Sequence, residues 1–405
     1  MKRTFSKPVL QNHAETTIDV VWSVCALSTG FVEISEREDL SGARKIPAIK
    51  GDHACQWGVG DCALHVHVDG LRPATRYWYR AATLAVDYPG AYMIQTDPPI
   101  YGDVHSFVTA GAAAKSEFAV VNDTHERLAT VRRIAGILEA DPTPVLVWNG
   151  DAFEPRTLRH AADAMLASTA GALSDTPLLY TIGNHETRGI DAWRLDEVMV
   201  KRPFAERCSQ FWMLGRNFAV RQGDIAILGL DTGEDKADRR PEWAGLANFE
   251  PYRRLQADWL EEALARPEIA SAPFKVAICH IPLADDDPRH NPGGTERGDD
   301  RYSADFAYWE RSCGELWSPT FVRHGVQLVV AGHMHRFRYD APRAGRPWAQ
   351  IVGGGTGLGS DSATDSLHDV ATIIRVLVVD DRLVAEVRRL DNGESLGRYA
   401  FERAR

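Results

Sequence analysis

Histidine, aspartate and asparagine residues recur in this sequence directly after short apolar runs. In chain order they are Asp123 and His125, Asp151, Asn184 and His185, His280, and His333 and His335. All offer nitrogen or oxygen donors and none is a cysteine, a donor set that suits Mn, Fe or Zn. A carboxylate such as that of Asp151 has two oxygens and can bridge two ions. Two metal ions about 3.5–4 Å apart form a clamp for in-line displacement at phosphorus.

The apolar runs ahead of these residues are predicted to be strands. In the clearest one, residues 145–148 are apolar without interruption and Gly150 and Asp151 follow closely. Such a run fits a strand buried on both faces, as in a parallel sheet covered by helices. Further runs lie at 118–121, 178–182, 276–279 and 328–330. Because parallel sheets carry their chemistry at the carboxyl ends of the strands, we expect the donor residues to lie at that edge.

The pattern of the chain divides it into two parts. Residues 16–24 are rich in β-branched residues, and residues 64–68 alternate with period two, which predicts strands. Residues 71–80 resemble the tyrosine corner of a β-sandwich, and the whole segment resembles a fibronectin type III domain. From residue 116, apolar runs alternate with helix-like segments. We therefore predict an all-β sandwich domain over residues 1–110, followed by an α/β catalytic domain over residues 116–405.

Composition excludes several classes of protein. The 405 residues are 44% hydrophobic and 25% charged, as in a soluble globular protein. No apolar run approaches the roughly 20 residues that span a membrane, so no membrane partner is expected. The basic N-terminus has no apolar core after it, which predicts a cytoplasmic protein, or a secreted one if a leader has been trimmed. A net charge of -10 argues against a nucleic-acid partner but allows a small phosphorylated substrate.

The ordered motifs Asp-x-His, Gly-Asp, Gly-Asn-His-Glu, His and Gly-His-x-His resemble those of the calcineurin-like metallophosphoesterase superfamily. With a β-domain in front, the layout is similar to that of purple acid phosphatases, and the resemblance covers nearly the whole chain. It implies a four-layer α/β/β/α catalytic sandwich. It also implies a centre of two divalent or mixed-valence metal ions, with Mn, Fe and Zn all open.

The same resemblance implies a role for each donor residue. The first metal would be held by Asp123, His125 and His335, the second by Asn184, His280 and His333, and Asp151 would bridge them. A hydroxide between the metals would attack phosphorus in line, and His185 would act as an outer-sphere acid or orient the phosphate. Arg188 and Arg336 flank metal motifs and are candidate substrate contacts, with solvated surface as an equal alternative.

Two residues depart from the purple acid phosphatase pattern. Glu154 stands where those enzymes have a tyrosine, three residues after the bridging aspartate, whose charge transfer to ferric iron gives their colour. Those enzymes also lack the histidine of the first motif, where this chain has His125. The metal centre therefore resembles that of the wider superfamily.

Several interpretations stay open. Hydrolysis by a phosphomonoesterase ranks ahead of hydrolysis by a phosphodiesterase acting on cyclic nucleotides or other diesters. A non-catalytic metal-binding or adhesion protein is a rival of another class, against which the complete ligand set argues. His65 and His67 could bind a metal, but their alternation predicts a solvent-facing strand. The glycine-rich residues 353–359 lack the Lys-Thr of a P-loop, so we predict a tight loop near the site.

Overall fold

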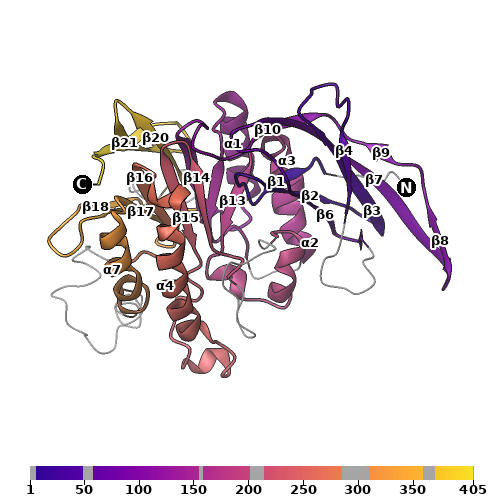
Figure 1. Cartoon of the computed structure of the whole chain (residues 1–405). Helices are drawn as coiled ribbons and strands as arrows, with labels where there is room; N and C mark the ends of the chain where they lie inside the picture. Colours follow the sequence, from indigo (N-terminus) through magenta and orange to yellow (C-terminus); the bar gives the residue numbers. More distant parts are fainter. Residues whose placement is uncertain are drawn as a thin grey trace.

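The computed structural model describes residues 6–48, 58–154, 158–200, 214–284, 308, 310–358 and 370–404. Figure 1 shows a β-rich N-terminal part beside a larger part in which helices flank two sheets. The predicted order, a β-sandwich followed by an α/β sandwich, is confirmed. Within the described ranges, no helix has the length and apolar character needed to cross a membrane.

The larger of the two central sheets has nine strands. In spatial order they are β22 (Ser395–Phe401), β21 (Arg382–Arg389), β20 (Thr372–Val379), β11 (Glu117–Val121), β12 (Leu146–Asn149), β13 (Leu178–Thr181), β1 (Val9–Gln11), β2 (Ile18–Ser23) and β6 (Ala63–Val68). Strands β11, β12 and β13 are parallel, and β13 pairs in parallel with β1. The sheet thus continues from the α/β part into the N-terminal β part. The division at residues 110 and 116 stays a prediction, and the two parts on either side of it share one sheet.

The second central sheet has six strands. They are β14 (Phe218–Gln222), β15 (Ile225–Leu230), β16 (Phe274–Cys279), β17 (Leu328–Ala331), β19 (Ala349–Val352) and β18 (Arg338–Asp340), in spatial order. Strands β15, β16, β17 and β19 are parallel. This sheet packs on the nine-stranded sheet through a shared apolar core that includes Val120, Val147, Ile278 and Val330. Two sheets in face-to-face contact form the middle layers of the predicted four-layer sandwich.

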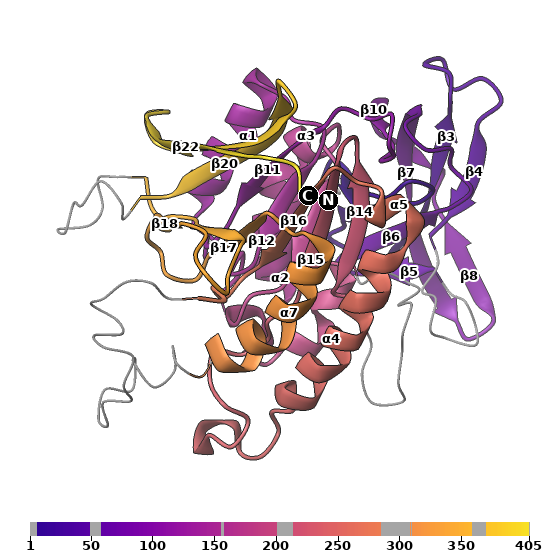
Figure 2. The same cartoon turned by 60° about the vertical axis from the view of Figure 1, so that its left-hand side comes forward.

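Helices cover the outer face of each sheet. The nine-stranded sheet is covered by α1 (Leu128–Ala140), α2 (Leu158–Ala161), the π-helix η1 (Ala162–Ala167) and α3 (Ser168–Leu173), and the six-stranded sheet by α4 (Phe249–Ala265), α5 (Pro267–Ala270), η5 (Glu310–Gly314) and α7 (Glu315–His324). Figure 2 shows α4 and α7 in front of the six-stranded sheet. Short 3-10 helices lie in the loops: η2 (His185–Thr187), η3 (Ala192–Glu197) and η4 (Pro241–Trp243).

The layers explain the uninterrupted apolar run before Asp151. Alternate residues of a strand point to opposite faces. Leu146 and Trp148 pack in the core under α1, α2 and α3, whereas Val145 and Val147 pack between the two sheets. Both faces are apolar, so every position of the strand carries an apolar residue.

The N-terminal part closes a sandwich over β1, β2 and β6. Its second sheet has the order β10 (His105–Val108), β7 (Arg76–Gly90), β3 (Ser28–Ser35) and β4 (Arg44–Pro47), with β5 (Val59–Gly60) on β3 and with β8 (Met93–Thr96) and β9 (Ile100–Tyr101) on β7. Trp22 and Tyr79 are buried between the sheets. The predicted tyrosine corner is present, since the Tyr77 hydroxyl accepts a hydrogen bond from the Arg72 N–H at 3.0 Å.

Candidate metal centre

The candidate ligands lie where the parallel strands of the two sheets end. Asp123 follows β11, Asp151 follows β12, Asn184 follows β13, His280 follows β16, and His333 and His335 follow β17. Five of the candidate ligands have left-handed backbone with φ between 44° and 70°: Asp123, His125, Asp151, His333 and His335. Such conformations cost on the order of 1–3 kcal/mol each outside glycine and cluster at functional sites. The backbone is strained where these side chains turn toward one another.

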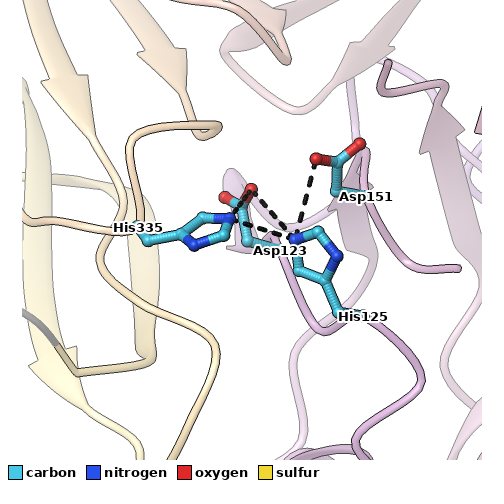
Figure 3. A group of neighbouring side chains, drawn as sticks. All are labelled: Asp123, His125, Asp151 and His335. Carbon is cyan, nitrogen blue, oxygen red and sulfur yellow. Dashed lines mark hydrogen bonds and ion pairs between the residues drawn. The ribbon is translucent and has the colours of Figure 1, made fainter. Parts of the chain in front are cut away.

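One group consists of Asp123, His125, Asp151 and His335, which Figure 3 shows converging from separate loops. The Nε2 atom of His125 lies 3.9 Å from Asp123 Oδ1, 3.7 Å from Asp151 Oδ2 and 3.0 Å from His335 Nε2. His335 Nε2 lies 3.3 Å from Asp123 Oδ1. Two carboxylates and two imidazoles therefore face one point, as the donors of a metal site must.

A second group consists of Asp151, His280 and His333 and shares its aspartate with the first. His280 Nε2 lies 3.1 Å from Asp151 Oδ2. The amide oxygen of Asn184 joins this group, 2.8 Å from His333 Nδ1. All seven candidate ligands that the sequence motifs suggested are thus gathered in two adjoining groups.

The chemistry of the donors fits two metal ions. His280 is fully buried, its Nδ1 bonds to the backbone oxygen of Asn149 at 2.9 Å, and its Nε2 has no hydrogen-bond partner. Asp123 and Asp151 are buried as well, with 0% and 1% of their surface exposed. A buried imidazole nitrogen that faces two buried carboxylates matches the demands of cations held between them.

The charges of these groups depend on one another. Burial disfavours the imidazolium form of His280, but the carboxylates of Asp151 and Asp123 outweigh burial and raise the pKa of His280 to about 10. Burial likewise opposes ionisation of Asp151, yet the neighbouring His280 holds the pKa of this carboxyl well below its usual range. Burial and the charge of His280 lower the pKa of His333 to about 4. In metal-free protein, a proton on His280 balances part of the carboxylate charge.

We expect metal binding at pH 7 to release protons, because a metal ligand must be neutral imidazole and His280 is protonated without metal. The measurement is a titration of chelator-stripped protein with Zn²⁺ or Mn²⁺ in weak buffer containing a pH indicator. The variant His280→Gln should release fewer protons per chain, whereas His324→Gln, on the remote helix α7, should release as many as the parent. Equal release from the His280 variant would show that this residue does not exchange a proton for metal.

Glu154 holds two histidines at once. Its Oε1 lies 2.8 Å from His125 Nδ1 and its Oε2 lies 3.2 Å from His185 Nδ1. The two rings are nearly perpendicular, with centroids 4.6 Å apart. A carboxylate on Nδ1 fixes the tautomer and the orientation of an imidazole and leaves Nε2 to face the site. The residue that replaces the tyrosine of purple acid phosphatases therefore positions a candidate ligand, His125, and the candidate acid, His185.

Replacing Glu154 should lower the rate of catalysis while the protein keeps its bound metal ions. We expect Glu154→Ala to lower kcat/KM by about 10–100-fold, the usual effect of losing a partner of a ligating histidine. Glu154→Gln keeps one oxygen acceptor and should lose less. The measurement combines kcat/KM over a range of pH with metal content. An Ala variant that keeps the parental rate and pH profile would contradict the assigned role.

Glu186 is a second residue whose role the sequence did not reveal. Its buried carboxylate accepts hydrogen bonds from the backbone N–H groups of Asp151 at 3.0 Å, Phe153 at 3.0 Å and Gly183 at 2.7 Å. Burial, followed by the nearby charge of Asp151, raises the pKa of Glu186 to about 7. The side chain ties the loop after β12 to the loop after β13. Its only sequence signal is its place at the end of the Gly-Asn-His-Glu motif.

The two arginines predicted as substrate contacts, Arg188 and Arg336, lie outside the two groups of candidate ligands. Arg188 forms two hydrogen bonds of 2.7 Å with the carboxylate of Glu234 and one of 2.9 Å with Asp235. Its charge is already balanced by two carboxylates. Arg336 is half-buried directly after His335. Substrate contact by either arginine stays a prediction.

Two other sequence features are also outside the metal groups. His65 and His67 are half-buried on β6, and both bond to one oxygen of the buried Asp19, at 2.7 and 2.8 Å. They are partnered within the sheet rather than simply facing solvent. The described part of the glycine-rich run lies close to β11, because a Cβ added to Gly353 would be 2.1 Å from Asn122 Oδ1.

The chain belongs to the calcineurin-like phosphoesterase family, whose family model matches residues 116–337. It is similar to purple acid phosphatase 21 of Arabidopsis thaliana, with 22% identity over 284 residues, covering 69% of this chain and 53% of that protein. It is also 21% identical over 288 residues to phosphoenolpyruvate phosphatase of Allium cepa, covering 67% of this chain and 49% of that protein. The chain thus spans about half the length of these curated relatives.

A solved structure shows the same fold over almost the entire chain. The purple acid phosphatase PPD1 from yellow lupin (Lupinus luteus) seeds superposes with a TM-score of 0.67 at 14% identity, covering 99% of this chain and 75% of the lupin chain. This agreement includes the N-terminal β part as well as the α/β part.

Proposed function

We propose that this protein is a phosphoester hydrolase that depends on two metal ions and acts on small phosphomonoesters. The observation that carries the proposal is the pair of adjoining donor groups that share Asp151. When bound, two adjacent metal ions would supply a water that is nucleophilic at neutral pH and would neutralise charge on the phosphoryl oxygens. The donor set favours Mn, Fe or Zn without choosing among them.

The residues around the metals have separate tasks in this proposal. Asp123, His125 and His335 would hold one ion, Asn184, His280 and His333 would hold the other, and Asp151 would serve both. His185 is hydrogen-bonded through Nδ1 to Glu154, and its Nε2 lies 3.9 Å from Asp151 Oδ2. The ring thus faces the centre without belonging to the seven ligands, and it can give a proton to the leaving group.

A small pocket lies beside His185, on the side of the ring where that leaving group would depart. Its lining includes the apolar side chains of Phe153, Leu158 and Leu195 together with Glu154 and Arg188. The preference for monoesters is supported by the names of the relatives, a purple acid phosphatase and a phosphoenolpyruvate phosphatase. Diesters are the alternative substrates within the same mechanism.

The proposal is tested by a hydrolysis screen of metal-loaded protein with matched monoesters and diesters. We expect monoesters to have the higher kcat/KM, and chelation to remove turnover of both. Higher kcat/KM for diesters would overturn the substrate class. Absence of turnover for every phosphoester, in protein that holds two metal ions, would overturn the proposed activity.

A further inference from the structure

A buried carboxylate that belongs to neither donor group lies close to one of the candidate ligands. Glu234, in the loop after β15, has 2% of its surface exposed. Its Oε1 accepts hydrogen bonds from the Thr187 hydroxyl at 2.8 Å and from Arg188 Nε at 2.7 Å, and its Oε2 accepts one from Arg188 Nη2 at 2.7 Å. Bidentate pairs of guanidinium and carboxylate combine strength with geometric specificity. We call these three residues, Thr187, Arg188 and Glu234, the loop clamp.

The loop clamp joins loops that come from different sheets. Thr187 and Arg188 lie in the loop after β13 of the nine-stranded sheet, whereas Glu234 follows β15 of the six-stranded sheet. The donor group assigned to the second metal straddles the same two sheets, since Asn184 follows β13 while its two histidines follow β16 and β17. The distance between these donors therefore depends on how the loops of the two sheets are held together.

On one side, the loop clamp holds the turn that carries Asn184. This residue directly precedes the 3-10 helix η2, and at the other end of η2 the backbone N–H of Arg188 donates to the His185 carbonyl oxygen at 3.2 Å. The Thr187 hydroxyl donates a bifurcated hydrogen bond to Glu234 Oε1 at 2.8 Å and to the Asn184 carbonyl oxygen at 2.9 Å. A displacement of Glu234 would therefore shift the backbone from which the Asn184 side chain reaches the candidate metal site.

On the other side, buried contacts fix the loop that carries Glu234. Arg253 on α4 is fully buried, and its Nη2 donates to the Glu234 carbonyl oxygen at 2.6 Å and to the Thr232 carbonyl oxygen at 2.7 Å. The Thr232 hydroxyl accepts a hydrogen bond of 3.3 Å from the backbone N–H of Ile281, the residue after His280. The loop is therefore anchored to a helix and to the segment that carries another candidate ligand of the second metal.

We propose that Glu234 and Arg188 are positioning residues for the second metal ion, the one assigned to Asn184, His280 and His333. The inference rests on the two-metal centre of the proposed function. The loop clamp keeps Asn184 at a fixed distance from the two histidines of the other sheet, so the donors are in place before the ion binds. Partners that fix metal ligands in this way typically contribute about 10–100-fold to metal affinity.

The first metal site is not connected to the loop clamp. In the described part of the chain, none of the side-chain hydrogen bonds of the clamp goes to Asp123, His125 or His335. The His125 ring is oriented by a different carboxylate, that of Glu154. Loss of the clamp should therefore weaken one of the two metal sites, whereas a general loss of stability would weaken both.

The test is the number and affinity of metal ions bound by the full-length protein, measured by titrating chelator-stripped protein with Mn²⁺ or Zn²⁺. The parent should bind two ions. Glu234→Ala should bind one ion as the parent does and the other at least about 10-fold more weakly. Its activity should return as the metal concentration is raised, which a misfolded variant would not show. Glu234→Gln keeps an oxygen acceptor for Thr187 and Arg188 and should lose less affinity.

A matched control lies in the neighbouring 3-10 helix η3. Arg194 and Glu197 form the same kind of pair, with hydrogen bonds of 2.9 and 3.2 Å, and within the described ranges neither bonds to a candidate ligand. Glu197→Ala should therefore bind both ions as the parent does. Unchanged affinity of both sites in Glu234→Ala, equal weakening of both sites, or weakening of the same size in Glu197→Ala would overturn the inference. A parent that binds fewer than two ions would overturn the proposed function, and the inference with it.

Discussion

Protein carrying Asp151→Ala is expected to lose turnover by more than about 10³-fold, or ~4 kcal/mol of transition-state stabilisation. Asp151 is the carboxylate common to both donor groups. One of its oxygens, Oδ2, lies 3.1 Å from His280 Nε2 and 3.7 Å from His125 Nε2. In the proposed centre, removing it would take a ligand from each metal and leave His280 without its closest carboxylate. We therefore expect metal content to fall by at least one ion per chain.

The measurement is kcat/KM together with metal content by mass spectrometry on the same preparation. Asp163→Ala is a suitable control, because Asp163 is an exposed carboxylate on η1 and should leave both quantities unchanged. Circular dichroism establishes that the variant is folded. Full activity with a full complement of metal in Asp151→Ala would remove Asp151 from the centre.

The second large effect concerns His185 and depends on the substrate. A histidine that protonates a departing alkoxide contributes typically about 10²–10⁴-fold. A nitrophenolate leaves without a proton, whereas a sugar or alkyl alkoxide does not. His185→Asn should therefore lose about 10²–10⁴-fold on alkyl phosphates and far less on activated aryl phosphates, with both metals retained.

A leaving-group series decides this point, with kcat/KM measured for parent and variant on each substrate. The ring bonds to Glu154 and faces Asp151 Oδ2 at 3.9 Å, so a positioning role for the phosphate is the competing explanation. A uniform loss across the series would mean that His185 orients the phosphate rather than donating a proton. Loss of metal from the variant would instead make His185 a ligand.

The local sequence was enough to predict the layers of the α/β sandwich and the sheet edge that carries the candidate metal centre. The reason is physical. Strand β12 lies between a helical layer and a second sheet, so Leu146 and Val147 are both buried although they face opposite ways. Polar residues follow each such strand, and parallel strands bring their carboxyl ends to one edge. The seven candidate ligands therefore meet in space although more than 200 residues separate Asp123 from His335.

Other features depend on contacts between distant parts of the chain. The continuous sheet rests on the pairing of Gln11 with Leu178, and the Gln11 side chain also donates to the Val198 carbonyl at 2.8 Å. No local pattern predicts which strand β1 will join. Likewise Glu154 could be identified as the substitute for a tyrosine, but its bonds to His125 and His185 depend on the approach of two separate loops.

The central claim, a two-metal hydrolase, is tested most directly by metal reconstitution. Chelator-stripped protein is titrated with Mn²⁺ or Zn²⁺, and bound metal and the rate of phosphomonoester hydrolysis are measured at each step. We predict that activity appears with metal and saturates at two ions per chain, in keeping with the two donor groups that share Asp151. Activity that survives complete stripping, or that saturates at a single ion, would contradict the account.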